Sequence, residues 1–262
     1  MTLAYGWVAA PADLEPGPLP AARGPLTDWL FTTLTRPVHG AAAPDPGGLG
    51  DPLREDDAAL ALYVLYELHY RGFDGVSEDW EWEPSLLAVR RELEAAFLDG
   101  LREAARGDDV AGDVEGGLYR IASNAAGRSL SAYLARGGTL EQLREYAVHR
   151  SAYQLKEADP HTWAIPRLVG GVKAAMVEVQ ADEYGTGHER DMHQNLFALT
   201  MATLGLDPGY GAYLDLLPAR TLAAVNVVSF FGLHRRWRGA LVGHLALFEM
   251  TSVEPMGRYA QA

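Results

Sequence analysis

The chain has 262 residues, of which 48% are hydrophobic, and its formal net charge is −13. This composition is sufficient for a buried core and argues against a largely disordered chain. So acidic a chain is repelled by nucleic acid and by anionic membrane surfaces, because both are bound mainly through Lys and Arg. The absence of cysteine excludes disulfides, a thiolate zinc site and a cysteine nucleophile. Any metal must therefore be held by imidazole and carboxylate ligands.

The N-terminal residues do not have the pattern of a targeting segment. Residues 1–25 contain no basic stretch ahead of an apolar one, and Pro and Gly are frequent in residues 11–25, unlike a secretory signal. No later run reaches the roughly 18 continuous apolar residues that a membrane span needs. We therefore expect a cytoplasmic protein with neither a membrane nor a nucleic-acid partner.

Helical periodicity, with Gly and Pro near the ends of the periodic segments, predicts an all-α fold. No window has the alternation or the β-branched enrichment of a strand. Gly72, Gly107 and Gly185 follow expected helix ends, and Pro218 suits a first helical turn. The expected helices, in chain order, are Leu26–Leu34, Glu55–Arg71, Ser85–Arg106, Arg128–Leu134, Leu140–Lys156, Leu168–Tyr184, Glu189–Leu204 and Pro218–Met250.

The chain is expected to consist of three parts. Residues 1–52 form a tail, a short helix and a loop, residues 53–110 form a helical N-terminal region, and residues 111–262 form a helical domain. The boundary before the last part is placed in the Asp- and Gly-rich run 107–117. That run is equally compatible with a loop inside a single domain.

Three polar side chains stand where helical spacing predicts core residues. Glu183 continues the apolar stripe of its helix, Glu249 shares a face with Leu245, and His193 begins a stripe that continues with Phe197. An unpaired buried carboxylate costs several kcal/mol. Two carboxylates that point inward therefore require a cation, a proton or hydrogen-bond partners.

Each of these side chains also has a simpler interpretation. Glu183 lies near the end of its helix and could reach solvent, and His193 could be a hydrogen-bonded core histidine. Glu249 could pair with Arg235 or Arg238, which precede it on the same expected helix.

Three segments carry a family resemblance. The segments are HRSAYQLKEADPHTWAIPRL at 149–168, VEVQADEYGTGHERDMH at 177–193 and FFGLHRRWRGALVGHLALFEMTS at 230–252. They resemble the iron-containing redox enzymes of the heme-oxygenase-like diiron oxidase superfamily, over about residues 55–262 and most clearly from residue 128 onward. The resemblance implies that Glu183, His193 and Glu249 are metal ligands and that Glu157 matches an additional upstream carboxylate.

The resemblance also implies a fold and a chemistry. The fold would be a heme-oxygenase-like helical bundle that binds two Fe(II) ions, uses O2 as co-substrate and contains no heme. The substrate would be a small amino-acid-like or fatty-acid-like molecule, and the ligand set would also suit Mn. Aromatic side chains would form the dry wall of the pocket. The candidates are Tyr153, Trp163, Phe197 and Phe248.

The sequence departs from the family pattern at its C-terminal end. The family completes its metal site with His-x3-Asp-x2-His on one further helix, and no His of this chain is followed by Asp four residues later. Ser252 and Pro255 have the residue types of a new helix start. We therefore expect a shortened family member that holds part of the metal site, with its final metal-binding helix truncated.

A second function stays open, namely an inactive helical scaffold derived from the same family. An unfinished bundle would expose an apolar C-terminal groove, which favours a homodimer or a partner helix that covers it. An oxidase needs the missing ligands from elsewhere, whereas a binding module needs none.

Overall fold

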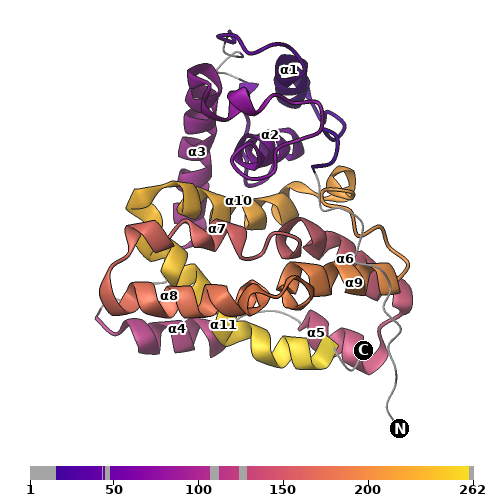
Figure 1. The fold of residues 1–262 in the computed structure, drawn as a ribbon, viewed down its shortest axis with the longest axis vertical. Coiled ribbons are helices and arrows are strands. Elements are labelled where there is room, and N and C mark those ends of the chain that lie inside the picture. The colour runs from indigo at the N-terminus through magenta and orange to yellow at the C-terminus, as the bar shows by residue number, and fades with distance from the viewer. Residues whose placement is uncertain (1–15, 43, 45–47, 107–111, 124–128, 260–262) are drawn as a thin grey trace.

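The protein is helical throughout the part of the chain that the structure describes. The computed structural model describes residues 16–42, 44, 48–106, 112–123 and 129–259 (Figure 1). These residues form helices, turns and loops, and they contain no strand. The prediction of an all-α fold is confirmed.

The helices follow one another with short connections. Short 3₁₀ turns lie between several of them. The α-helices are α1 (Pro25–Leu34), α2 (Asp56–Glu67), α3 (Pro84–Ala104), α4 (Val114–Ser123), α5 (Leu130–Gly137), α6 (Leu140–Gln154), α7 (Asp159–Thr162), α8 (Gly170–Glu183), α9 (His193–Thr203), α10 (Ala219–Leu233) and α11 (Arg238–Tyr259).

Most expected helices are present with shifted ends, and the largest difference is at the C-terminal end. The segment expected as one helix, Pro218–Met250, is two helices separated at His234, whose extended backbone ends α10. Pro255 lies inside α11 and does not begin a new helix after Ser252, so that expectation is wrong. Helix α4 occupies part of the region expected as an acidic loop; its first residue is Val114.

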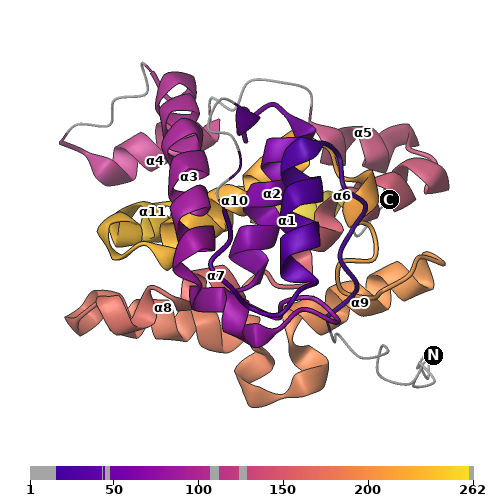
Figure 2. The same cartoon turned by 90° about the horizontal axis from the view of Figure 1, so that it is seen from above.

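Helix α2 lies at the centre of the molecule. Every residue from Ala58 to Glu67 is buried, as expected for a helix that is apolar around most of its circumference. Helices α1, α3 and α10 pack around it, and Figures 1 and 2 show α1, α2 and α3 stacked on the layer that contains α10. The N-terminal and C-terminal parts of the chain therefore share one core, while the predicted domain boundaries stay a prediction.

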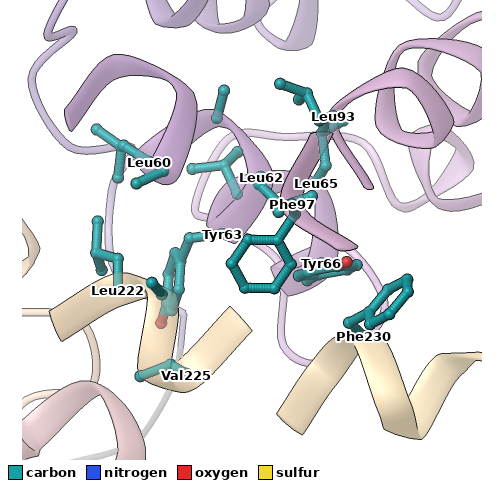
Figure 3. Packing of buried hydrophobic residues seen from close by; sticks show 14 of the residues in the cluster. Leu60, Leu62, Tyr63, Leu65, Tyr66, Leu93, Phe97, Leu222, Val225 and Phe230 are labelled. Carbon is teal, nitrogen blue, oxygen red and sulfur yellow. The ribbon is translucent and has the colours of Figure 1, made fainter. Parts of the chain in front are cut away.

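Large side chains of α2, α3 and α10 fill this core (Figure 3). Phe97 and Phe230 meet edge to face, with ring centroids 6.3 Å apart, the arrangement that aromatic quadrupoles favour. The other side chains labelled in the same cluster are Leu60, Leu62, Tyr63, Leu65, Tyr66, Leu93, Leu222 and Val225.

None of the helices in the described ranges is long and apolar enough to cross a membrane.

Candidate metal centre

Three of the predicted ligands converge on one point. The ligand atoms of Glu157, Glu183 and His193 all lie within 4.8 Å of one another. Nδ1 of His193 is 2.9 Å from a carboxylate oxygen of Glu183. Among the described residues, no other group of three His, Asp or Glu side chains meets in this way.

Glu157 lies in the break between α6 and α7. Helix α6 ends at Gln154 and α7 begins at Asp159, with Pro160 in its first turn. Because Pro160 has no N–H to donate to the carbonyl four residues earlier, α6 cannot run straight on through this position. The non-helical turn directs the Glu157 carboxylate toward α8, and the carboxylate accepts a 2.7 Å hydrogen bond from Gln154 Nε2.

Glu183 and His193 lie at the two ends of the connection between α8 and α9. Glu183 is the last residue of α8 and His193 is the first residue of α9. Gly185 turns the chain between them with a φ of +61°, and a Cβ there would be 2.6 Å from the backbone of Met192. Glycine is the residue that tolerates both the positive φ and the close approach. The expected interruption by glycine is therefore what brings the two side chains together.

The simpler interpretations of Glu183 and His193 do not fit their surroundings. The Glu183 side chain is only 11% exposed, so it does not reach freely into solvent. The His193 side chain is 40% exposed, so it is not a core histidine. Both side chains face the Glu157 carboxylate, with the ligand atoms of all three residues within 4.8 Å of one another.

Glu249 lies at the rim of the same site. It lines one small pocket together with Glu157 and Glu183. The expectation that it points into the core is only partly right, because Leu245 is buried one turn earlier whereas Glu249 is exposed. Arg235 precedes α11 and Arg238 begins it, three helical turns away from Glu249. An ion pair along the helix therefore does not explain this carboxylate.

The pKa values of two carboxyl groups and of the imidazole are raised at this site. Burial, reinforced by the negative charge of Glu183, raises the pKa of Glu157 to about 7. The same two causes raise the pKa of Glu249. The close contact of His193 with the Glu183 carboxylate raises the pKa of the imidazole. Because the negative charges of these carboxylates repel one another, a cation bound at the site would stabilise their ionised forms.

Sequence reasoning missed several polar groups around the site. Gln154 bonds Glu157, and its own Oε1 accepts from Arg150 at 2.6 Å. Gln180, three residues before Glu183 on α8, donates to the Ala158 carbonyl at 2.8 Å. Each of these two glutamines precedes a predicted ligand by three residues. This spacing was the available signal, because residues three and four apart on a helix share a face.

His161 is a further neighbour that was not predicted. It is buried, lines the pocket of the three carboxylates, and its Nε2 lies 3.4 Å from Nδ1 of His244 on α11. Burial lowers its pKa to about 4, so this imidazole is neutral at physiological pH. Helical spacing does not indicate it, because the chain passes from a turn into α7 between Glu157 and His161.

Two of the four expected wall residues lie at the site. Tyr153 and Phe248 line the pocket, with ring centroids 5.3 Å apart. Trp163 instead lines a separate cavity of about 330 Å³ with Tyr70 and Asp159. Phe197 packs against a second small hydrophobic cluster and does not line the pocket.

Part of the chain matches a known protein family. Residues 144–262 match the family model described as iron-containing redox enzyme. This region belongs to that family. No curated protein matches the chain.

The region that matches the iron-containing redox enzymes contains all four predicted ligand residues, Glu157, Glu183, His193 and Glu249. Helices α1 to α5 precede it.

The donor set fits iron, because carboxylate and imidazole ligands with open positions suit Fe(II). The phenol oxygen of Tyr153 and Oε1 of Gln180 line the same pocket and have no hydrogen-bond partner among the described residues.

Proposed function

We propose that the chain is a non-heme iron oxidoreductase in which Glu157, Glu183 and His193 bind iron and Glu249 supplies a further carboxylate. The observation that carries this proposal is the convergence of three donors from three separate segments within 4.8 Å. The iron-containing redox enzyme family supports iron as the metal, although the donor types alone would also suit Mn.

We further propose that the complete centre holds two Fe(II) ions and uses O2 as co-substrate. Bound ferrous iron would supply the electrons that reduce O2 while a substrate is oxidised. Protein donors in addition to the four named residues would be needed for a second ion. A second copy of the chain or a partner helix that covers the site would be able to supply them.

The side chains around the centre would control protons and water. In the metal-free protein Glu157 holds a proton over part of the neutral range, since its pKa is about 7. It must release this proton when a cation binds, because metal ligands are deprotonated. Tyr153 and Phe248 cover the apolar side of the pocket, which excludes water from a reactive site. We propose a small amino-acid-like or fatty-acid-like substrate, on the basis of the family resemblance.

The first test is iron stoichiometry after anaerobic addition of Fe(II), followed by optical spectra on mixing with O2. We expect about two irons per chain and a transient visible band that lacks the Soret absorption of heme. Weak or absent iron binding, with no band, would contradict the oxidase proposal.

The ligand assignment is tested by substitution on α8. Glu183→Ala removes the carboxylate that faces both other donors, and we expect iron affinity to fall by about ten-fold or more. Glu178→Ala is the matched control, because Glu178 is an exposed carboxylate on the same helix. Equal iron affinities of the two variants, measured by anaerobic titration, would show that Glu183 is not a ligand.

The second candidate function is an inactive helical scaffold that binds a partner. Exposed apolar side chains on the helices that carry the site favour it: on α8 Val172 is 54% exposed, and on α9 Leu196 and Leu199 are 46% and 43% exposed. Exposed apolar side chains suit a homodimer or a partner helix. Sedimentation of the metal-free chain, together with the iron titration, separates the two functions, because a scaffold would associate without binding iron.

A further inference from the structure

The turn that carries Glu157 is held by side chains on both sides of that residue. On the N-terminal side, the carbonyl of Leu155 accepts a 3.1 Å hydrogen bond from Arg71. The ammonium group of Lys156 lies 2.6 Å from the carboxylate of Glu67, and both side chains are only 1% exposed. The two residues before Glu157 are therefore anchored to α2 and to the turn that follows it.

The C-terminal side of the turn is anchored as well. The Ala158 carbonyl accepts from Gln180 at 2.8 Å. The Asp159 carboxylate accepts a 2.9 Å hydrogen bond from the hydroxyl of Tyr184 and lies 3.8 Å from the guanidinium of Arg71. Each residue next to Glu157 thus has a fixed contact with a neighbouring element.

Arg71 also reaches the segment that carries His193. Its guanidinium donates to Oε1 of Gln194 at 3.2 Å, one residue beyond His193 on α9. The same guanidinium lies over the ring of Tyr210, 4.2 Å from its centroid. Both hydrogen bonds come from one nitrogen, Nη2, and the planar guanidinium on the Tyr210 ring sets the direction of its two N–H groups. A lysine ammonium group has no plane that could fix its donors in this way.

We propose that Arg71, supported by the buried pair of Glu67 and Lys156, is a positioning residue that sets the separation of Glu157 and His193 at the metal centre. This inference rests on the proposed function. It extends the functional unit beyond the matched residues 144–262, because Glu67 and Arg71 belong to the N-terminal part of the chain.

The proposal has a physical basis in preorganisation. Glu157 lies in a turn between two helices, and His193 is the first residue of a helix, where backbone N–H groups lack partners inside the helix. Groups that orient metal ligands typically account for about 10- to 100-fold in metal affinity. Loss of the Arg71 guanidinium should therefore weaken metal binding without removing any ligand.

The test measures Co(II) binding by its visible absorption in the full chain and in the Arg71→Met and Arg71→Lys variants. We expect the affinity of both variants to fall about ten-fold or more, with altered visible bands. Arg71→Lys keeps the positive charge but not the planar guanidinium. This variant therefore distinguishes the effect of donor geometry from the effect of charge. An Arg71→Lys variant with parental affinity and spectrum would overturn the positioning role.

Arg167→Met is the matched control. Arg167 also donates to backbone carbonyls, but these belong to Gly232 and Leu233 at the end of α10, which carries none of the proposed ligands. We expect this variant to bind Co(II) as the parent does, even where its melting temperature falls. Equal losses of affinity in Arg167→Met and Arg71→Met would mean that Arg71 acts only through general stability.

Hydrogen exchange in the metal-free chain gives a second readout. Arg71→Met should raise amide exchange in residues 155–159 and 193–196, whereas Arg167→Met should not. Unchanged exchange in both segments would contradict the inference. Absence of Co(II) binding by the parent chain would overturn the proposed function, whereas parental binding that Arg71→Met leaves unchanged would overturn only the role of Arg71.

Discussion

At the scale of single residues, Glu157 is held in an environment that disfavours its charge. Burial and the nearby Glu183 raise its pKa to about 7 from an ordinary value of 4.5. Gln154 donates one hydrogen bond to it, and the positive charge of Arg150 opposes the shift only in part. Such a carboxyl group is partly protonated near neutral pH when the site is empty of cations, and it is ionised when a cation occupies the site.

The raised pKa of Glu157 predicts how the stability of the metal-free chain depends on pH. A folded pKa above the unfolded one stabilises the fold at low pH, and this stabilisation is lost as pH rises from about 4.5 to 7. We therefore expect Glu157→Gln to become more stable relative to the parent by about 2 to 3 kcal/mol between pH 5 and pH 8. Urea unfolding in the presence of a chelator measures this difference.

The comparison must be made as a difference, because two neighbouring histidines act in the opposite direction. Burial lowers the pKa of His161 and of His244, so both destabilise the fold as pH falls toward 4. Their contribution is common to the parent and to Glu157→Gln. A stability difference that stays constant from pH 5 to pH 8 would show that Glu157 ionises normally.

At the scale of elements, α7 is positioned by a close approach of α10. A Cβ placed on Gly232 of α10 would be 2.6 Å from the carbonyl oxygen of Pro160 in α7. Real Cβ atoms do not approach backbone oxygen so closely, so any larger residue would push the two helices apart. The short helix that follows the Glu157 turn thus depends on a glycine far away in the sequence.

Gly232→Ala is predicted to destabilise the protein by about 1 to 3 kcal/mol, because the added methyl group cannot be accommodated without backbone movement. Gly243→Ala on α11 is the control, because no neighbouring atom of the described residues lies within 4 Å of the place that a Cβ would take there. Alanine there should stabilise the helix by up to about 1 kcal/mol. Thermal or urea unfolding measures both, and equal effects of the two substitutions would contradict the close contact.

At the scale of the whole molecule, an ion pair joins the N-terminal and C-terminal parts inside the core. Lys156 Nζ contacts Glu67, and it also lies 4.8 Å and 4.4 Å from the ring centroids of Tyr63 and Tyr70. Tyr210 donates a 2.7 Å hydrogen bond to the same Glu67 carboxylate. Two buried charges of opposite sign therefore depend on each other across the interface between α2 and the Glu157 turn.

Breaking this pair on one side should cost more than removing both charges. Lys156→Met alone leaves a buried carboxylate without its cation, and we expect a loss of about 3 to 5 kcal/mol in unfolding free energy. Lys156→Met combined with Glu67→Gln removes the charge while keeping an acceptor for Tyr210, so it should lose less. A double-mutant cycle by urea unfolding checks this; additive losses would mean that the pair does not interact.

The sequence by itself determined the class of fold and most of the candidate site. Helical periodicity is a local property, so α1, α3, α6 and α8 were predictable to within a few residues. A carboxylate or imidazole within an apolar stripe is also visible locally, which is how Glu183 and His193 were selected. Gly185 predicted the helix end between them, because the backbone freedom of glycine is a property of the residue itself.

Only the tertiary structure decided how these residues are supported. Arg71 and Gln194 are 123 positions apart, and Lys156 and Glu67 are 89 positions apart. Contacts of this kind depend on how α2 packs against the C-terminal helices, and no local pattern encodes that packing. The break at His234 and the exposure of Glu249 depend on it in the same way. An apolar stripe fixes which face of a helix is buried, but where the helix ends and what covers that face are set by its neighbours.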